Sequence, residues 1–199
     1  MNFAVFASGN GGNLQAIIGA VRAKKIRASL KLVVSDKADA YALVRARKAK
    51  IPTLYLNPKD FADREAFDRA VLGHLKEHKI DFIVLAGYMR LLSSHFIRQY
   101  AGKIINVHPA LLPAFKGAHG IRDAFAYGVK VTGATVHFVV DEIDAGPIIL
   151  QETAAVSPKD TEASVARKIH RVEHKIYPQA IDLFARGKLR IAGRQVIIK

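Results

Sequence analysis

The chain has 199 residues, half of them hydrophobic, and no cysteine. This length gives room for one domain with a real core, and the lack of cysteine excludes a disulfide scaffold, a thiolate metal site and a cysteine nucleophile. The net charge of +14, from 31 Lys and Arg against 17 Asp and Glu, favours anionic partners such as nucleic acid, a membrane surface or a phosphorylated small molecule.

The first charged residue is Arg22, so the chain opens on a long uncharged segment. Asparagines and glycines interrupt its apolar run and no positive segment precedes it, which excludes a signal peptide and a membrane helix. No later stretch is long enough to span a bilayer. The sequence therefore predicts a soluble, cytoplasmic protein with no membrane partner.

Apolar runs alternate with helical patterns through the first half of the chain. The runs that predict strands are Asn2 to Ala7, Leu30 to Val34, Pro52 to Leu56, Asp81 to Ala86 and Lys103 to Asn106. The patterns that predict helices are Leu14 to Val21, Tyr41 to Lys50, Arg64 to His78 and Ser93 to Tyr100. Such alternation favours a mostly parallel, twisted sheet with helices on both faces and an active site at the carboxyl ends of its strands.

After Asn106 the pattern changes. A proline-bracketed loop over residues 108–113 is followed by more strands and helices. These are a helix at Ile121 to Tyr127, strands at Thr132 to Val140 and Ile148 to Thr153, a helix at Thr161 to Arg186 with a kink at Pro178, and a hairpin at Leu189 to Ile198. No repeat or linker divides the chain. We expect one Rossmann-like α/β domain over residues 1–199, with a phosphate-binding half over 1–100 and a catalytic half over 101–199.

A glycine-rich loop, Ser8 to Asn13, lies between the first predicted strand and helix. Backbone N–H groups and a helix N-terminus at such a place bind anions, and Gly11 and Gly12 allow the backbone to approach a ligand. The dinucleotide fingerprint needs a third glycine where Leu14 stands, and no Gly-Lys-Ser/Thr follows for a Walker A loop. The loop therefore predicts a site for a single phosphate; a tight turn without a ligand is the alternative.

Asn106 and His108 share one face of a strand end, because alternate residues of a strand point the same way. An amide donor and an imidazole can hold a developing oxyanion and move a proton, as acyl or formyl transfer requires. In the acidic loop of residues 141–147, Asp144 precedes the stiff Ala145-Gly146-Pro147 segment and could orient His108 and favour its charged form. A hydrogen-bonded turn and a solvated acidic turn are the alternatives.

Two further patterns bear on whether the chain binds a metal or a nucleic acid. His170 to His174 matches the inverted zincin motif H-x-x-E-H, but no partner motif offers a third acidic ligand, so we predict no metal. Within it, Glu173 is a candidate carboxylate for binding an amine. The basic segments 22–27, 45–50 and 186–194 have the composition of solvated helix faces and carry no nucleic-acid motif, so no nucleic-acid partner is expected.

Together, the motifs resemble folate-dependent phosphoribosylglycinamide formyltransferases, in order and over nearly the whole chain. The matching segments are Ser8 to Ile17, Leu85 to Arg90, Asn106 to Pro113, Gly133 to His137, Asp144 to Pro147, Glu173-His174 and Tyr177-Pro178. The resemblance implies transfer of the formyl group of 10-formyltetrahydrofolate, a co-substrate, to the amine of glycinamide ribonucleotide in purine biosynthesis. It also implies small-molecule partners only, no metal, and a monomer or weak homodimer.

The same resemblance implies a role for individual residues. Asn106, His108 and Asp144 would be catalytic, and Glu173 would hold the amine of the ribonucleotide. The phosphate cradle would consist of Gly11, Gly12 and Asn13. The folate contacts would be Arg64, Met89, Arg90, Leu91 and Leu92 from the first half, and Asn106, Val140, Asp141, Glu142, Ile143 and Asp144 from the second, which we expect to be folate-binding as well as catalytic.

Other functions remain open at this point. A formyltetrahydrofolate hydrolase shares the catalytic module but carries an extra amino-terminal domain, whereas this chain enters its first strand at Asn2. A methionyl-tRNA formyltransferase adds a carboxy-terminal domain, and only about a dozen residues follow Arg186. A nicotinamide-dependent oxidoreductase could use Asp36 as its ribose ligand, and a non-catalytic binding module would suit the charge. Lys116 could contact a substrate carboxylate or face water.

Overall fold

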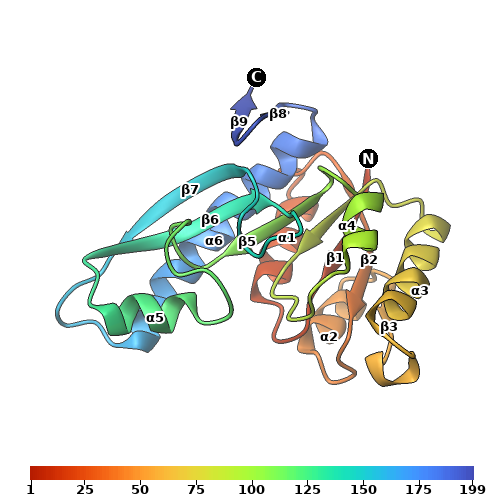
Figure 1. The fold of residues 1–199 in the computed structure, drawn as a ribbon, viewed down its shortest axis with the longest axis horizontal. Coiled ribbons are helices and arrows are strands. Elements are labelled where there is room, and N and C mark those ends of the chain that lie inside the picture. Colours follow the sequence, from red (N-terminus) through yellow and green to blue (C-terminus); the bar gives the residue numbers. More distant parts are fainter.

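A nine-stranded sheet runs through the molecule in the computed structural model, which describes residues 1–199 (Figure 1). Its strands are β1 (Asn2–Phe6), β2 (Ser29–Ser35), β3 (Thr53–Tyr55), β4 (Phe82–Leu85), β5 (Ile104–His108), β6 (Val131–Phe138), β7 (Ile148–Ala155), β8 (Leu189–Ala192) and β9 (Gln195–Ile198). The order across the sheet is β3-β2-β1-β4-β5-β6-β7-β9-β8.

The first five strands are parallel, and the direction reverses at β6. β7 is antiparallel to β6, and the β8–β9 hairpin joins the sheet through a parallel pairing of β9 with β7. The predicted single, mostly parallel α/β domain is confirmed. β5 extends to His108, two residues beyond the predicted strand, because its last residues pair with β6.

Helices cover both faces of the sheet (Figure 1). They are α1 (Gly12–Arg22), α2 (Tyr41–Lys48), α3 (Arg64–Glu77), α4 (Ser94–Gln99), α5 (Gly120–Tyr127) and α6 (Glu162–Ala185), with a short 3₁₀ turn at Pro58–Asp60 that the sequence analysis did not predict. None of them combines the length and the apolar character that crossing a membrane requires.

Two hydrophobic clusters fasten these helices to the sheet. The larger one contains 29 buried residues and joins α1, α2 and α6 to one face of the strands. The smaller one has 12 residues and joins α3 and α4 to the other face of β1, β2, β4 and the start of β5. Past Ile104, that second face of β5 is not packed in the smaller cluster, and Asn106 and His108 project there.

The long helix α6 is anchored to the sheet by a buried tyrosine. Thr161 and Ser164 form a capping box at the start of the helix, which continues through Pro178. Directly before Pro178, Tyr177 is 1% exposed, and its hydroxyl lies 2.7 Å from the Leu85 carbonyl and 3.0 Å from the Ile105 carbonyl. The hydroxyl therefore ties α6 to the backbones of β4 and β5.

Replacing Tyr177 with Phe removes this hydroxyl and little else. We expect Tyr177→Phe to lower the free energy of unfolding by about 1–3 kcal/mol, because two buried carbonyls lose their donor. Urea denaturation measures the change. Tyr127→Phe, at a side chain that is 80% exposed, is the matched control and should leave stability unchanged. A Tyr177→Phe protein as stable as the wild type would contradict the anchoring role.

Candidate active site

His108 and Asp144 form an ion pair at the carboxyl end of β5. His108 Nδ1 lies 3.3 Å from Asp144 Oδ2, and both side chains are less than one-tenth exposed. His108 is the last residue of β5, whereas Asp144 comes from the loop between β6 and β7. The structure therefore brings together two residues that the sequence places 36 positions apart, as predicted.

The loop that carries Asp144 is closely constrained. Asp144 has a positive φ of 50°, which is unusual for a residue other than glycine. The Gly117 N–H donates to Asp144 Oδ2 at 2.8 Å. Gly146 lies so close to the backbone of β6 that a Cβ there would stand 1.7 Å from the Phe138 carbonyl oxygen. Only glycine fits at position 146, and this tight approach turns the loop back over the open face of β5.

The second nitrogen of His108 also faces an acceptor. His108 Nε2 lies 2.7 Å from the carbonyl oxygen of Phe115, so it donates a hydrogen bond there. With Asp144 facing Nδ1, both ring nitrogens are directed at oxygens that can only accept. A doubly protonated imidazolium satisfies both contacts. The ring of His108 is thus held between two hydrogen-bond acceptors.

Asn106 pairs across the sheet with a histidine that the predicted site did not include. His137 stands opposite Asn106 in the antiparallel register of β5 and β6, and Asn106 Nδ2 lies 3.3 Å from His137 Nε2. The same Nε2 is 3.6 Å from Asp144 Oδ1, and His137 Nδ1 bonds to the Phe138 carbonyl. His137 therefore belongs to the cluster and fixes the Asn106 amide from the side.

The environment of Asp144 favours its charged form. Burial raises the pKa of this carboxyl, but hydrogen bonds from His137 and the Gly117 N–H, and the charges of His108 and His137, outweigh burial and hold the pKa below its ordinary value. A carboxylate is therefore available to both histidines in the neutral pH range.

The glycine-rich loop is held rigidly between β1 and α1. Gly11 has a φ of 75°, and a Cβ there would stand 2.9 Å from Ala42 of α2. The guanidinium of Arg45, also on α2, donates to the Asn10 carbonyl at 2.8 Å and to the Asn10 side chain at 2.9 Å. α1 begins within this loop, at Gly12, so the free N–H groups of the first turn of the helix belong to the loop.

Glu173 lies beside this loop although it comes from α6. It is 3% exposed, and its Oε2 accepts hydrogen bonds from Asn13 Nδ2 at 3.2 Å and from His170 Nδ1 at 2.8 Å. Asn13 Oδ1 is buried without a hydrogen-bond partner. His174, by contrast, lies against Gly12, where its Nε2 would be 3.5 Å from an added Cβ. The two histidines of the zincin-like motif thus face different partners.

The residues predicted to contact folate lie mostly in two loops. The loop after β4 carries Met89 and Leu91, and the loop after β6 carries Val140 and Ile143; all four are exposed apolar side chains. Leu92 and Val139, one from each loop, pack on the same smaller hydrophobic cluster, so both loops lie on that side of the sheet. The other predicted members of these loops are Arg90, Asp141 and Glu142.

The two arginines of the predicted folate set, Arg90 and Arg64, lie in different surroundings. Arg90 stacks its guanidinium 4.5 Å above the ring of Phe67, and its Nε is buried without a partner. Arg64 is the exposed first residue of α3 and makes no hydrogen bond or ion pair to the other predicted folate residues. Lys116, left open by the sequence, forms an ion pair with Glu142 at 2.9 Å.

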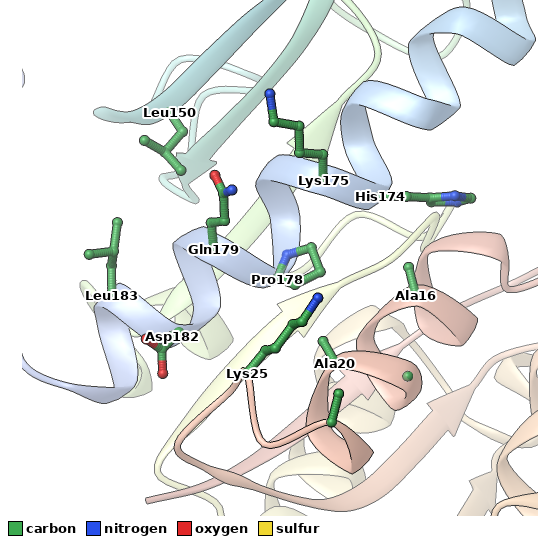
Figure 2. Close-up of a pocket in the computed structure, with 12 residues that line it drawn as sticks. Ala16, Ala20, Lys25, Leu150, His174, Lys175, Pro178, Gln179, Asp182 and Leu183 are labelled. Atoms are coloured by element: carbon green, nitrogen blue, oxygen red, sulfur yellow. The ribbon is translucent and has the colours of Figure 1, made fainter.

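A cavity of about 660 Å³ lies elsewhere, between α1 and α6 (Figure 2). Ala16 and Ala20 line it from α1, Pro178 and Asp182 from α6, and Lys25 projects into it from the segment after α1. It belongs to the α1–α6 side of the sheet, whereas Asn106 and His108 project from the opposite face. The hydrogen-bonded polar cluster, not the cavity volume, therefore marks the candidate catalytic centre.

Comparison with known proteins identifies the family of this chain. Residues 1–181 match the formyl transferase family. The chain belongs to that family. It is 45% identical over 191 residues to the phosphoribosylglycinamide formyltransferase of Escherichia coli K12, which covers 96% of the chain and 90% of that relative. The enzyme of the same name from Bacillus subtilis 168 is 44% identical over 179 residues, or 90% of the chain and 92% of the relative.

Solved formyl transferase structures share the fold. The crystal structure of glycinamide ribonucleotide transformylase 1 from Symbiobacterium toebii superposes with a TM-score of 0.97 at 45% sequence identity. It covers the whole of this chain and 93% of that one. The agreement includes the mostly parallel sheet on which the polar cluster is built.

Sequence reasoning missed His137 and His170 as members of the site. The Gly133 to His137 segment matched the family, but no role was drawn from it. Once β6 is placed antiparallel to β5, strand alternation puts Thr135 and His137 on the face of Asn106, which is the signal that could have found the second histidine. His170 lies one helical turn before Glu173, a spacing that brings two side chains together.

The His170–Glu173 contact makes a pH-dependent contribution to stability. The hydrogen bond to Glu173 raises the pKa of His170 above its ordinary value, although burial lowers it. A raised pKa in the folded state means that the stabilisation is complete below the unfolded value, about 6.5, and is lost as pH rises through the folded value. We expect the difference in unfolding free energy between wild type and His170→Gln to narrow as the pH rises above about 6.5.

Urea denaturation at several pH values measures this difference. Repeating the comparison in a Glu173→Gln background is the control, because there the ionic partner is gone and the difference should no longer vary with pH. A difference that stays constant with pH in the wild-type background would show that the contact does not favour the charged imidazole.

Proposed function

We propose that the chain is a phosphoribosylglycinamide formyltransferase, which transfers the formyl group of 10-formyltetrahydrofolate to the amine of glycinamide ribonucleotide in purine biosynthesis. The observation that carries this proposal is the buried cluster of Asn106, His108 and Asp144 at the end of β5, in a chain whose near-full-length relatives bear that enzyme's name. Cytoplasmic location and a monomeric or weakly dimeric state remain predictions.

The glycine-rich loop is the proposed phosphate site. Gly11, Gly12 and Asn13 lie where the N–H groups at the start of α1 are free, and the helix dipole there favours an anion. The buried, unpartnered Oδ1 of Asn13 shows a polar group at this place that the protein itself does not satisfy. The excess of positive charge on the chain would draw a ribonucleotide phosphate and the carboxylates of folate toward the molecule.

Glu173 is the proposed partner of the substrate amine. Its carboxylate is buried beside the glycine-rich loop and receives hydrogen bonds from Asn13 and His170 at one oxygen, Oε2. No hydrogen bond is formed at the other oxygen, Oε1, which is free to accept from an amine. The hydrogen bond between Asn13 and Glu173 joins the two halves of the chain, because Asn13 belongs to the proposed phosphate-binding half and Glu173 to the proposed catalytic half.

Asn106 and His108 are the proposed donors for the oxyanion that forms when the neutral amine attacks the formyl carbon. The imidazolium arrangement of His108 supplies a charged N–H at Nε2, where the Phe115 carbonyl accepts in this structure and the formyl oxygen would accept during reaction. His137 restrains the Asn106 amide. Both donors are oriented by the protein before charge develops, which is what makes such stabilisation effective.

Asp144 is the proposed partner for proton movement. Attack forms the new C–N bond, and collapse of the resulting tetrahedral intermediate breaks the bond to the folate nitrogen, so the amine must lose one proton and the folate nitrogen must gain one. Asp144, kept charged by its surroundings and set against His108, can balance the imidazolium and assist this transfer, directly or through water.

The exposed apolar side chains of Met89, Leu91, Val140 and Ile143 would contact the ring system of the folate.

A formyl-transfer assay with purified protein tests the function. We expect turnover of 10-formyltetrahydrofolate, followed by the absorbance of the folate product, only when glycinamide ribonucleotide is present. Equal turnover without the ribonucleotide would indicate a hydrolase instead. Formyl transfer to charged initiator tRNA in place of the ribonucleotide would indicate the tRNA-directed enzyme.

Removal of either member of the buried pair tests the residue roles. We expect His108→Ala and Asp144→Asn each to lower kcat by about 10²–10³-fold, the typical cost of losing one stabilising group at a developing oxyanion. His74→Ala and Asp123→Asn, both on exposed helix faces, are the matched controls and should keep wild-type rates. Near-normal formyl transfer by either site variant, with its fold intact by circular dichroism, would overturn that residue's assignment.

A further inference from the structure

The β8–β9 hairpin at the end of the chain lies beside the loop that carries Asp144. β9 is joined to the sheet by the parallel pairing of Gln195 with Ile148, the first residue of β7. In a parallel pair, the residues that precede each partner also run side by side. Arg194 is therefore placed next to the end of the β6–β7 loop, and Figure 1 shows the hairpin at this edge of the sheet.

One side chain of the hairpin contacts that loop directly. The Arg194 guanidinium donates through Nη1 to the carbonyl oxygen of Ala145 at 3.0 Å. Ala145 is buried and follows Asp144, so this hydrogen bond fixes the peptide next to the catalytic carboxylate. A charged donor makes a stronger hydrogen bond than a neutral one. The hairpin itself is supported, since Leu189 and Val196 pack against the larger hydrophobic cluster.

Besides the contacts of Asp144 with His108 and His137, two fastenings of this loop come from the segment after Phe115. Gly117 holds the Asp144 carboxylate, and Lys116 pairs with Glu142. Both residues follow Phe115, whose carbonyl occupies His108 Nε2 and must give way to the formyl oxygen in the proposed reaction. A displacement of that segment would weaken these two fastenings at the moment of reaction, whereas the hydrogen bond from Arg194 would persist because it comes from the turn of the hairpin that pairs with β7.

We propose that Arg194 is a positioning residue, which holds the Asp144 loop in the conformation that sets the Asp144 carboxylate against His108. The inference rests on the proposed function, in which that carboxylate takes part in formyl transfer. Arg194 would touch neither substrate; it would act by keeping the strained backbone at Asp144 and the tight approach at Gly146 in place.

Kinetics of Arg194→Ala test the proposal. We expect kcat to fall about tenfold, the factor that corresponds to losing one hydrogen bond from a charged donor, while KM for glycinamide ribonucleotide stays unchanged. Arg194→Lys keeps a charged donor and should recover part of the loss. Arg190→Ala removes an exposed arginine of the same hairpin that makes no side-chain hydrogen bond, and should behave as the wild type.

A double-variant comparison separates positioning from a general loss of structure. If Arg194 acts through Asp144, Arg194→Ala should cause no further loss of rate in an Asp144→Asn background. Additive losses would overturn the proposal, as would a loss in Arg190→Ala equal to that in Arg194→Ala, or a raised KM for the ribonucleotide in place of a lowered kcat.

Hydrogen exchange in the protein without substrates gives a readout that does not depend on activity. Backbone amides of residues 141–146 should exchange faster in Arg194→Ala than in the wild type, with the amides of β4 and β5 unchanged. Unchanged exchange in this loop would overturn the proposal even if formyl transfer is confirmed. If instead the wild type transfers no formyl group, the proposed function fails, while the exchange data still decide whether Arg194 holds the loop.

Discussion

The antiparallel pairing of β5 with β6 is the constraint on which the site depends. The first five strands run in one direction, so their carboxyl ends meet at one edge of the sheet. After a loop and α5, β6 pairs antiparallel to β5 and sets His137 opposite Asn106 and Thr135 opposite His108. Because β6 runs backwards, the loop that leaves it can fold over the same face and deliver Asp144.

The cluster on this face is stable because its polar groups satisfy one another. Thr135 is fully buried; its hydroxyl donates to the Ala110 carbonyl and accepts from Leu112 N–H and Gln151. This one side chain holds the start of the loop after His108 in place. Buried polar groups cost free energy unless they are paired, so a network in which each member has a partner can persist at the edge of a hydrophobic core.

Most elements of the fold were predictable because local signals and tertiary structure agree. Alternating apolar runs and helical spacing located the strands and the main helices, and the glycines after β1 marked the loop that is proposed to bind phosphate. Asn106, His108 and Asp144 were predictable as a set from strand ends and turn chemistry; in the structure His108 pairs with Asp144, and His137 lies against both Asn106 and Asp144. Their catalytic roles stay predictions, as do the roles of the folate residues.

The remaining features depend on long-range pairing that no local pattern contains. His137 lies in a strand that is buried on both faces, so its partnership with Asn106 follows only from the register. The length of β5 was underestimated because its last two residues are ordered by β6. Lys116 contacts Glu142 and Arg194 contacts Ala145, across 26 and 49 positions of the sequence. At such separations the charge of a side chain does not indicate which residue it will contact.

The fastening of the glycine-rich loop by Arg45 has a consequence for the thermodynamics of ligand binding. Asn10 is fixed from α2 by the two hydrogen bonds of Arg45, and Gly11 rests against Ala42, so the loop is ordered before any phosphate arrives. The conformational entropy of arranging its N–H groups is thus lost during folding rather than on association. An anion would meet a preformed cradle, and loosening Arg45 would weaken binding through its entropy, with the phosphate contacts themselves unaltered.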